Sequence, residues 1–358
     1  MALILSNTTI DPDIRKAKTL PSSFYTDPAK HSELKLRFRK IWHFAAHINQ
    51  LADKSAIELK HLEKLIDEPM IMTSEPATRC ISNVCTHRGM LIVDGHCSTN
   101  SLQCPYHGRT FSLDGSMRSM PEFEEVEEFP STEDNLRSFP TLNWKGLIFS
   151  GIEPSGIESS LAEMEKRVGW MPIEKFEYDA TRNRSYDINA NWALYVDNYL
   201  EGFHIPFVHK DLNRALDYDN YQTELFEGGV LQIGIASDGD STFEIPEDSP
   251  DFGLDVAAYY YWIFPGLMLN FYPWGLSVNL VVPLSVDITR IIYHGFVWDR
   301  RMLAKGAGGD LDKVESEDQA IVEATHRGVS SSSYNRGRYS PTKEKGVHHF
   351  HRILTNYP

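Results

Sequence analysis

The chain has 358 residues, of which 41% are hydrophobic and 24% charged, the composition of an ordinary globular protein. Its length predicts about two domains with a normal hydrophobic core. A formal net charge of −15 argues against binding of nucleic acid. Four cysteines are too few for a disulfide scaffold, so we expect a reducing, cytoplasmic setting. Because the sequence has neither a secretory signal nor a run of about 18 apolar residues, we expect no membrane association.

The first half of the chain has the pattern of an extension followed by a β domain. Residues 1–40 are predicted to form an N-terminal extension, with a helical pattern from about Lys30 to Ile41. Residues 41–154 show short strand-like runs separated by turn signals, which predicts an all-β domain. Within it, the acidic stretch from Glu122 to Asp134 is interpreted as a solvated loop. The strand-like runs are Met70–Thr73, Ile81–Val84, Leu91–Val93, Thr110–Leu113 and Leu147–Phe149.

Residues 155–358 predict a second domain of mixed structure. A helical pattern covers 159–168, and a longer one covers 310–327. Long alternating strands before the second helix predict an α+β fold, with an antiparallel sheet around that helix. The predicted strands are Val230–Ile235, Ala257–Phe264, Leu267–Phe271, Ser277–Pro283 and Thr289–Trp298.

Two Cys/His pairs in the β domain have the spacing of a metal site. Cys85-Thr86-His87 is followed, sixteen residues later, by Cys104-Pro105-Tyr106-His107. Two thiolates and two imidazoles are the ligands of a Rieske 2Fe-2S centre, although a zinc site uses the same residue types. A glycine follows each pair closely and lets backbone approach the cluster sulfurs, which favours the Rieske interpretation. Such a centre relays single electrons, so we expect a second centre downstream to receive them.

The second candidate site combines Glu201, His204 and His209. Apolar residues within 192–203 recur at helical spacing, which predicts a helix with Glu201 and His204 one turn apart. Pro206 is expected to end that helix, so that His209 approaches a metal from the helix exit. A solvated Glu/His pair has the same pattern. Two histidines with one carboxylate and open positions are, however, the ligand set of non-heme Fe(II) sites that activate O2.

The carboxylate ligand is sought in the acidic helix predicted over 310–327. At i, i+3, i+4 spacing, Asp318 falls on the apolar stripe, and a buried carboxylate is usually paired or bound to metal. A buried Asp paired with an arginine or a backbone donor is the alternative, and Glu201 is a second candidate ligand. The predicted stripe is Leu311, Val314, Asp318, Ile321 and Thr325, with Asp312, Glu315, Glu317 and Glu323 on a solvated face.

These motifs resemble the catalytic alpha subunit of the Rieske non-heme iron oxygenases over nearly the whole chain. The resemblance rests on the Cys-x-His…Cys-x-x-His motif with its Pro-Tyr-His-Gly continuation, the Glu-x-x-His-x-x-x-x-His segment and a late Asp. It implies a Rieske all-β domain, residues 41–154, inserted into a helix-grip catalytic domain, residues 155–358. The extension of residues 1–40 is then expected to pack on the catalytic domain.

The resemblance also implies two sets of metal ligands and a bridge between subunits. Glu201 is the implied inter-subunit electron bridge, linking an iron ligand to His107 of a neighbouring subunit in a homotrimer. Electrons are expected from a separate NAD(P)H-dependent reductase that carries flavin or an iron–sulfur cluster. The implied cluster ligands are Cys85, His87, Cys104 and His107, and the implied ligands of the mononuclear Fe(II) are His204, His209 and Asp318.

In its glutamate at position 201 the chain resembles the family branch that oxidises choline, carnitine and betaines. Ring dioxygenases of the family usually carry Asp at that position. The Phe264–Trp274 stretch and the Tyr334–His351 segment are similar to the same branch. We therefore expect O2-dependent hydroxylation or N-demethylation of a small quaternary ammonium or betaine-like substrate. The alternatives are an aromatic-ring hydroxylating dioxygenase or demethylase and, in another class, an electron-transfer iron–sulfur protein or a zinc-stabilised binding module.

Four aromatic residues are candidates for holding a quaternary ammonium group. Aromatic faces attract such cations by about 0.5–2 kcal/mol per well-placed ring. Filling of the strand core is the alternative, because alternation sends only half of a strand's side chains to the pocket side. A betaine carboxylate would also require an arginine, which the sequence does not identify. The four candidates are Tyr261, Trp262, Tyr272 and Trp274.

Overall fold

The computed structural model describes residues 9–53, 55–74, 77–209, 217, 220–237, 239–303, 305–308 and 311–356. The chain divides into two compact units. The smaller unit is Lys35–Gly156 with Ile173–Lys175. The larger unit is Ile157–Pro172 with the described parts of Met1–Leu34 and Phe176–Pro358. Among the described helices, none is both long and apolar enough to cross a membrane.

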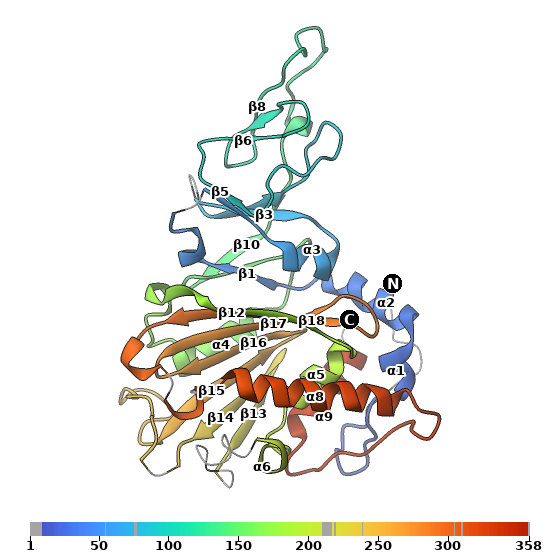
Figure 1. The fold of residues 1–358 in the computed structure, drawn as a ribbon, viewed down its shortest axis with the longest axis vertical. Helices are drawn as coiled ribbons and strands as arrows, with labels where there is room; N and C mark the ends of the chain where they lie inside the picture. Colours follow the sequence, from blue (N-terminus) through green and yellow to red (C-terminus); the bar gives the residue numbers. More distant parts are fainter. Residues whose placement is uncertain are drawn as a thin grey trace. The chain divides into compact units, whose positions relative to one another are not determined.

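The smaller unit is built from short antiparallel strands (Figure 1). Its sheets have the orders β1-β11-β10, β5-β2-β3-β4-β9 and β6-β7-β8. One strand prediction is wrong, because Leu91–Val93 forms only a single bridge, between Leu91 and Val84. The strands are β1 (His43–His47), β2 (Ala56–Glu58), β3 (Met70–Thr73), β4 (Arg79–Ser82), β5 (His96–Cys97), β6 (Leu102–Gln103), β7 (Thr110–Phe111), β8 (Met117–Ser119), β9 (Ser138–Phe139), β10 (Thr141–Trp144) and β11 (Leu147–Ser150), with helices α3 (Lys60–Ile66), η1 (Ile48–Leu51), η2 (Thr132–Asp134) and η3 (Ile173–Lys175).

The larger unit contains a seven-stranded antiparallel sheet with the order β12-β18-β17-β16-β15-β14-β13. Its central strands are buried along almost their whole length, which explains their near-continuous runs of apolar and aromatic residues. The strands are β12 (Glu177–Ile188), β13 (Gln222–Phe226), β14 (Gly229–Ile235), β15 (Val256–Ile263), β16 (Leu267–Tyr272), β17 (Gly275–Pro283) and β18 (Thr289–Val297).

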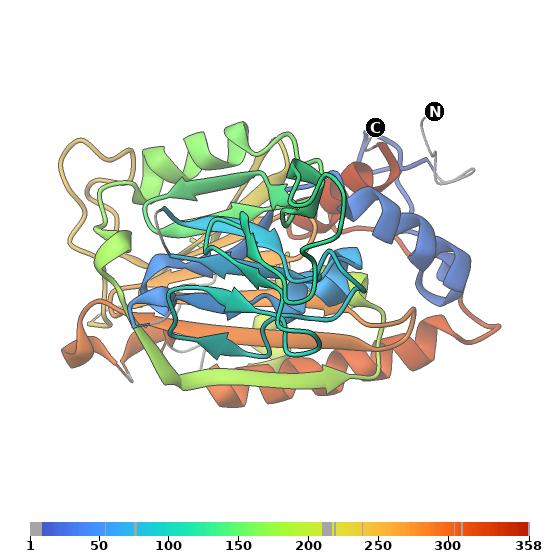
Figure 2. The same ribbon diagram turned by 90° about the horizontal axis from the view of Figure 1, so that it is seen from above.

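Helix α8 (Leu311–Val329) is the long helix of this unit and lies along β12, where Arg184 pairs with Asp312 (Figures 1 and 2). Helix α5 (Trp192–Tyr199) packs against α8 and is capped by Asn191, whose side chain accepts from the amide of Ala193. The remaining helices are α1 (Ser22–Thr26), α2 (Pro28–Phe38), which continues into the smaller unit, α4 (Glu158–Val168), α6 (Ile205–Val208), η4 (Arg300–Met302), η5 (Gly306–Gly308) and α9 (Lys345–Asn356).

A buried hydrogen-bond network joins α5 to α9 and α1. Asp197 of α5 accepts from Tyr25 at 3.0 Å and contacts Nε2 of His351 at 2.8 Å. Tyr339 contacts the other ring nitrogen of His351 at 2.7 Å. Because each polar group in this buried set has a partner, the network fixes the helix that leads into the candidate metal site.

Candidate metal centres

The segment from α5 to His209 differs from the single helix predicted for it. Helix α5 ends at Tyr199, and a separate four-residue helix, α6, begins at Ile205. The prediction that Pro206 ends a helix is wrong, since Pro206 lies in the first turn of α6, where its missing N–H needs no partner. Phe203, the last of the apolar residues at helical spacing, is 42% exposed. The break turns the chain, so that both histidines reach the same point.

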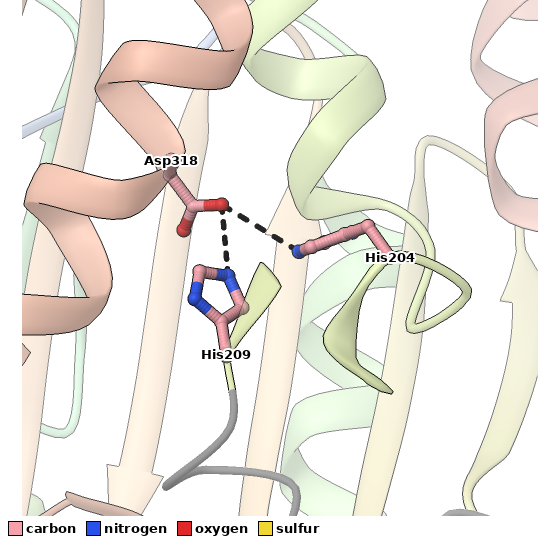
Figure 3. Close-up of side chains that lie close together, drawn as sticks. All are labelled: His204, His209 and Asp318. Carbon is pink, nitrogen blue, oxygen red and sulfur yellow. Dashed lines mark hydrogen bonds and ion pairs between the residues drawn. The ribbon is translucent and has the colours of Figure 1, made fainter. Parts of the chain in front are cut away.

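His204, His209 and Asp318 converge although 109 residues separate the last two (Figure 3). One ligand atom from each lies within 4.8 Å of the other two. Oδ1 of Asp318 is 3.0 Å from Nε2 of His209 and 3.5 Å from Nε2 of His204. His209 is only 1% exposed, whereas the other two are partly buried. Two imidazoles and one carboxylate around a common point fit a non-heme iron ion with open positions.

Each of these histidines is anchored through its second ring nitrogen. Nδ1 of His204 contacts Glu201 at 2.7 Å, and Nδ1 of His209 contacts Glu317 at 2.8 Å. Glu201 also accepts from the backbone amide of His204 at 3.0 Å. A carboxylate on Nδ1 leaves Nε2 free for a metal and orients the ring toward it. Glu201 therefore contacts a candidate ligand and is not itself part of the convergent group.

The buried stripe of α8 is rotated relative to the predicted one. Ile321 is 42% exposed and Val322 is 1% exposed, so the inward positions are Val314, Glu315, Asp318 and Val322. The expectation that Glu315 and Glu317 lie on a solvated face is wrong, because both are hydrogen-bonded within the site. Helical periodicity alone did not decide which acidic residues point inward, because acids occupy neighbouring positions of α8. Only packing fixes how the helix is rotated about its axis.

Glu315 is surrounded by three tyrosine hydroxyls. Tyr195 donates to it at 2.7 Å and Tyr186 at 3.2 Å, and Tyr293 donates to the same carboxyl oxygen. Burial raises the pKa of Glu315 to about 7, and the nearby charge of Asp318 acts in the same direction. The three hydroxyls oppose this rise, because hydrogen bonds stabilise the carboxylate. The same helix face thus carries one candidate metal ligand and one carboxyl that titrates near neutrality.

A cavity of about 90 Å³ adjoins the convergent group, and we call it the iron-site cavity. Its aromatic and acidic lining residues all belong to the larger unit, and the tyrosines come from α5, β15, β16 and the residue before β13. Its lining is chiefly polar side chains and tyrosine rings. The lining includes Glu201, Tyr221, Tyr260, Tyr272, Glu315 and Asp318.

The four aromatic candidates are placed in different surroundings. Tyr272 lines the iron-site cavity, and Trp274 lines a second cavity of about 530 Å³ between α8 and strands β12, β17 and β18. Tyr261 faces away and packs on Phe271, and the indole of Trp262 donates to the carbonyl of Pro265 at 3.1 Å. Tyr260, which the sequence reasoning did not select, lines the iron-site cavity because side chains alternate along β15.

In the smaller unit, the two Cys/His pairs lie on two loops with the same hydrogen-bond pattern. The amide of Gly89 donates to the carbonyl of Cys85 at 2.9 Å, and that of Gly108 donates to the carbonyl of Cys104 at 3.1 Å. Both glycines have φ between 73° and 76°, a conformation that favours glycine. The two thiols are buried in one core, and the rings of His87 and His107 are 4.9 Å apart.

This arrangement fits a Rieske cluster, because one thiol pair and one imidazole pair face each other from matching loops. Burial raises the pKa of the Cys85 thiol, and contact with Cys104 raises it further. Desolvation lowers the pKa of His87, as does the neighbouring ring of His107. Neutral imidazoles are the form that ligates a metal, whereas the thiols ionise when they bind one. Tyr106 stacks on His107 at 3.7 Å and is 57% exposed.

The two units and their Cys/His and His/Asp groups define a redox protein with a Rieske domain and a catalytic domain. Residues 41–130 match the Rieske 2Fe-2S domain, and residues 175–357 match the ring hydroxylating alpha subunit (catalytic domain). The chain belongs to the Rieske non-heme iron oxygenases, as a catalytic alpha subunit. It is therefore an oxidoreductase, which excludes a role as an electron carrier alone or as a zinc-stabilised binding module.

Among curated relatives, the chloroplastic choline monooxygenase of Beta vulgaris is 29% identical over 95% of this chain and 78% of its own length. The carnitine monooxygenase oxygenase subunit of Escherichia coli strain K12 is 26% identical over 95% of this chain and 94% of its own length. These similarities confirm the predicted resemblance to the choline and carnitine branch.

Solved structures share the fold. The quaternary ammonium Rieske monooxygenase in complex with its substrate L-carnitine has a TM-score of 0.76 at 21% identity, covering 98% of this chain and 99% of that one. Naphthalene 1,2-dioxygenase from Rhodococcus sp. bound to indole has a TM-score of 0.73 at 17% identity, covering 94% and 93%. The predicted fold class, a Rieske domain with an α+β catalytic domain, is thus confirmed.

Proposed function

We propose that this protein hydroxylates a C–H bond next to the nitrogen of a small quaternary ammonium or betaine-like substrate. One oxygen atom of O2 enters the C–H bond, and the other leaves as water after uptake of two electrons and two protons. If the hydroxylated carbon is an N-methyl group, collapse of the resulting carbinolamine releases formaldehyde and completes an N-demethylation. Monooxygenation of a quaternary ammonium compound agrees with the activities named for the choline and carnitine relatives.

The observation that carries the proposal is the lining of the iron-site cavity. Tyr221, Tyr260 and Tyr272 contribute rings next to the convergent His/His/Asp group, and Glu201 and Glu315 contribute carboxyls. Aromatic faces and carboxyls both attract an ammonium group, and neither needs a hydrogen bond from it. The small volume, about 90 Å³, favours a compact substrate end such as a trimethylammonium group.

We propose that His204, His209 and Asp318 hold the mononuclear iron and that Cys85, His87, Cys104 and His107 hold the cluster. The cluster supplies single electrons, and the iron supplies O2 activation. The protein's own residues orient the histidine rings, exclude bulk water and place the substrate end. Domain limits of 41–154 for the Rieske domain and 155–358 for the catalytic domain, with 1–40 as an extension, are part of the same proposal.

Electron supply is proposed to involve a partner and an assembly. A separate NAD(P)H-dependent reductase, with flavin or an iron–sulfur cluster, delivers electrons to this chain in the cytoplasm. In a homotrimer, Glu201 links His204 to His107 of a neighbouring subunit and so forms the electron bridge. The contact between Glu201 and Nδ1 of His204, at 2.7 Å, supports one end of that link.

The test is a substrate screen with purified protein, a surrogate flavin reductase and NADH. We expect oxygen uptake with choline, carnitine or a betaine, and formation of an amine together with an aldehyde or formaldehyde, detected by mass spectrometry. Uptake that occurs only with aromatic acids, with a cis-diol or phenol as product, would support the alternative of an aromatic-ring dioxygenase or demethylase. The Asp318→Ala variant is the control for oxygen uptake that does not depend on the iron site.

A further inference from the structure

Gln232 is a buried amide in the lining of the iron-site cavity. It is 1% exposed and lies in β14 between Leu231 and Ile233, whose side chains are also buried. Its Oε1 atom accepts no hydrogen bond from any residue in the described part of the chain. A buried acceptor without a partner is uncommon and destabilising in a folded protein, so this one requires an explanation.

The register of the seven-stranded sheet places Gln232 in a row of polar residues. Gln232 pairs with Tyr260 of β15, Tyr260 pairs with Asn270 of β16, and Asn270 pairs with Ser277 of β17. Residues directly opposite each other on neighbouring strands point to the same face of a sheet. The first three members of this row line the iron-site cavity, whereas Ser277 lines the second cavity. Gln232 therefore faces the cavity because of its place in the sheet.

Tyr199, the last residue of α5, fixes the orientation of the Gln232 amide. Nε2 of Gln232 donates to the backbone carbonyl of Tyr199 at 2.7 Å. Rotating the amide by half a turn would bring two oxygen atoms to that distance, so Nε2 and Oε1 cannot exchange places. The hydroxyl of Tyr199 also donates to Oδ1 of Asn270 at 2.5 Å. Of these two amide oxygens, that of Asn270 has a donor, and that of Gln232 is left for a donor that enters the cavity.

The other lining groups restrict what that donor can be. A quaternary ammonium group has no N–H, so it cannot donate to Gln232. A protonated amine would donate to the carboxyls of Glu201, Glu315 or Asp318, which line the same cavity, because hydrogen bonds to charged acceptors are stronger than those to a neutral amide. A hydroxyl group on the carbon chain is neutral, carries one donor and matches a neutral amide oxygen.

We propose that Oε1 of Gln232 accepts a hydrogen bond from a hydroxyl group of the substrate, which makes Gln232 a specificity-determining residue. A ligand with a hydroxyl group near its ammonium group satisfies this acceptor, whereas a ligand without one buries it unpaired. A buried polar group that is left unpaired discriminates more strongly between ligands than the loss of one apolar contact does. This inference rests on the proposed function, because it requires a quaternary ammonium compound in the iron-site cavity.

The test measures binding to the holoenzyme by isothermal titration, under anaerobic conditions without reductant, so that no turnover occurs. Two pairs of ligands are compared, choline with propyltrimethylammonium and L-carnitine with γ-butyrobetaine, because the members of each pair differ in one hydroxyl group. In the pair that wild type binds more tightly, we expect a preference of about 10- to 100-fold for the member with the hydroxyl group.

Two variants of Gln232 separate the acceptor from the shape of the side chain. Gln232→Met has a similar length and no amide oxygen, so the preference should fall to about twofold or less. Gln232→Glu, which burial favours in its neutral form, keeps a donor toward Tyr199 and an acceptor oxygen, so the preference should remain.

Ser277→Ala is the matched control, since it removes a buried hydroxyl from the same polar row outside the iron-site cavity, and it should leave the preference unchanged. Near-ultraviolet circular dichroism of each variant checks that the fold is intact. The absence of a preference in wild type, a preference that survives in Gln232→Met, or one that is lost in Gln232→Glu or Ser277→Ala would overturn the role of Gln232 and leave the proposed function standing. Binding of none of the four ligands by wild type would instead refute the proposed substrate class itself.

Discussion

Replacement of Glu201 by glutamine is the sharpest test of the proposed electron bridge, because the chain contains a matched control. Glu201 contacts Nδ1 of His204 at 2.7 Å, and Glu317 contacts Nδ1 of His209 at 2.8 Å. Glu201→Gln and Glu317→Gln therefore remove the same kind of carboxylate from equivalent positions. Each change is expected to weaken iron binding by about 10- to 100-fold, or about 1.4–2.8 kcal/mol.

The two variants should differ in electron delivery once iron has been restored. Glu317 anchors one ligand only, so reloaded Glu317→Gln should regain most of its turnover. Glu201→Gln should stay at least about 100-fold slower, because the link toward His107 of a neighbouring subunit loses its carboxylate. The assay is stopped-flow absorbance of the reduced cluster after mixing with O2 and substrate, with iron content measured on the same samples. The cluster absorbance reports its reoxidation directly, independently of product release.

Equal reoxidation rates in the two iron-loaded variants would refute the bridging role and reduce Glu201 to an anchor of His204. Equal and severe losses of the reoxidation rate in both variants would mean that the orientation of the two histidine rings controls that rate. A loss of the cluster signal in Glu201→Gln would contradict the separation of the two metal sites that the proposal requires.

Three further results are expected. Asp318→Ala should lose the mononuclear iron, measured by metal analysis, and keep the Rieske signal in electron paramagnetic resonance; retained turnover would show that another acid is the ligand. Burial lowers the pKa of both His43 and His47 to about 4, so each imidazole stays neutral in the folded protein near pH 7. In the unfolded chain the same imidazoles take up a proton near pH 6.5. The free energy of unfolding should therefore fall as the pH is lowered from above 6.5 toward 4. Between pH 8 and pH 5 the free energy of unfolding should fall by about 2 kcal/mol per imidazole. The measurement is thermal melting followed by the cluster absorbance, and a melting temperature that does not depend on pH would contradict the prediction. Asp197→Ala should cost about 2–3 kcal/mol in chemical denaturation because His351 loses its buried partner; a change under about 0.5 kcal/mol would show that the network is unimportant.

The spacing of residues along the sequence was sufficient to predict the features that depend only on neighbouring residues. The Cys/His pairs each need only a tight loop with a glycine four residues after the cysteine, and the structure has that loop at Gly89 and Gly108. The existence of β16, β17 and α8 likewise followed from patterns within short stretches of sequence. The family and the fold class followed from these motifs and are confirmed.

Contacts between segments that are distant in the sequence decided the features that the sequence did not predict. Helical periodicity placed Ile321 inward, but packing against α5 and β12 rotates α8 so that Glu315 faces three tyrosines. The break between α5 and α6 depends on where His209 must meet Asp318, which no local rule specifies. Arg182 lines a cavity at the place where a bulge in β12 meets Gly295 of the neighbouring strand. The sequence alone therefore determined the class of enzyme and predicted the types of metal ligand. The orientation of each side chain in the candidate site required the tertiary structure, because it depends on residues more than a hundred positions apart.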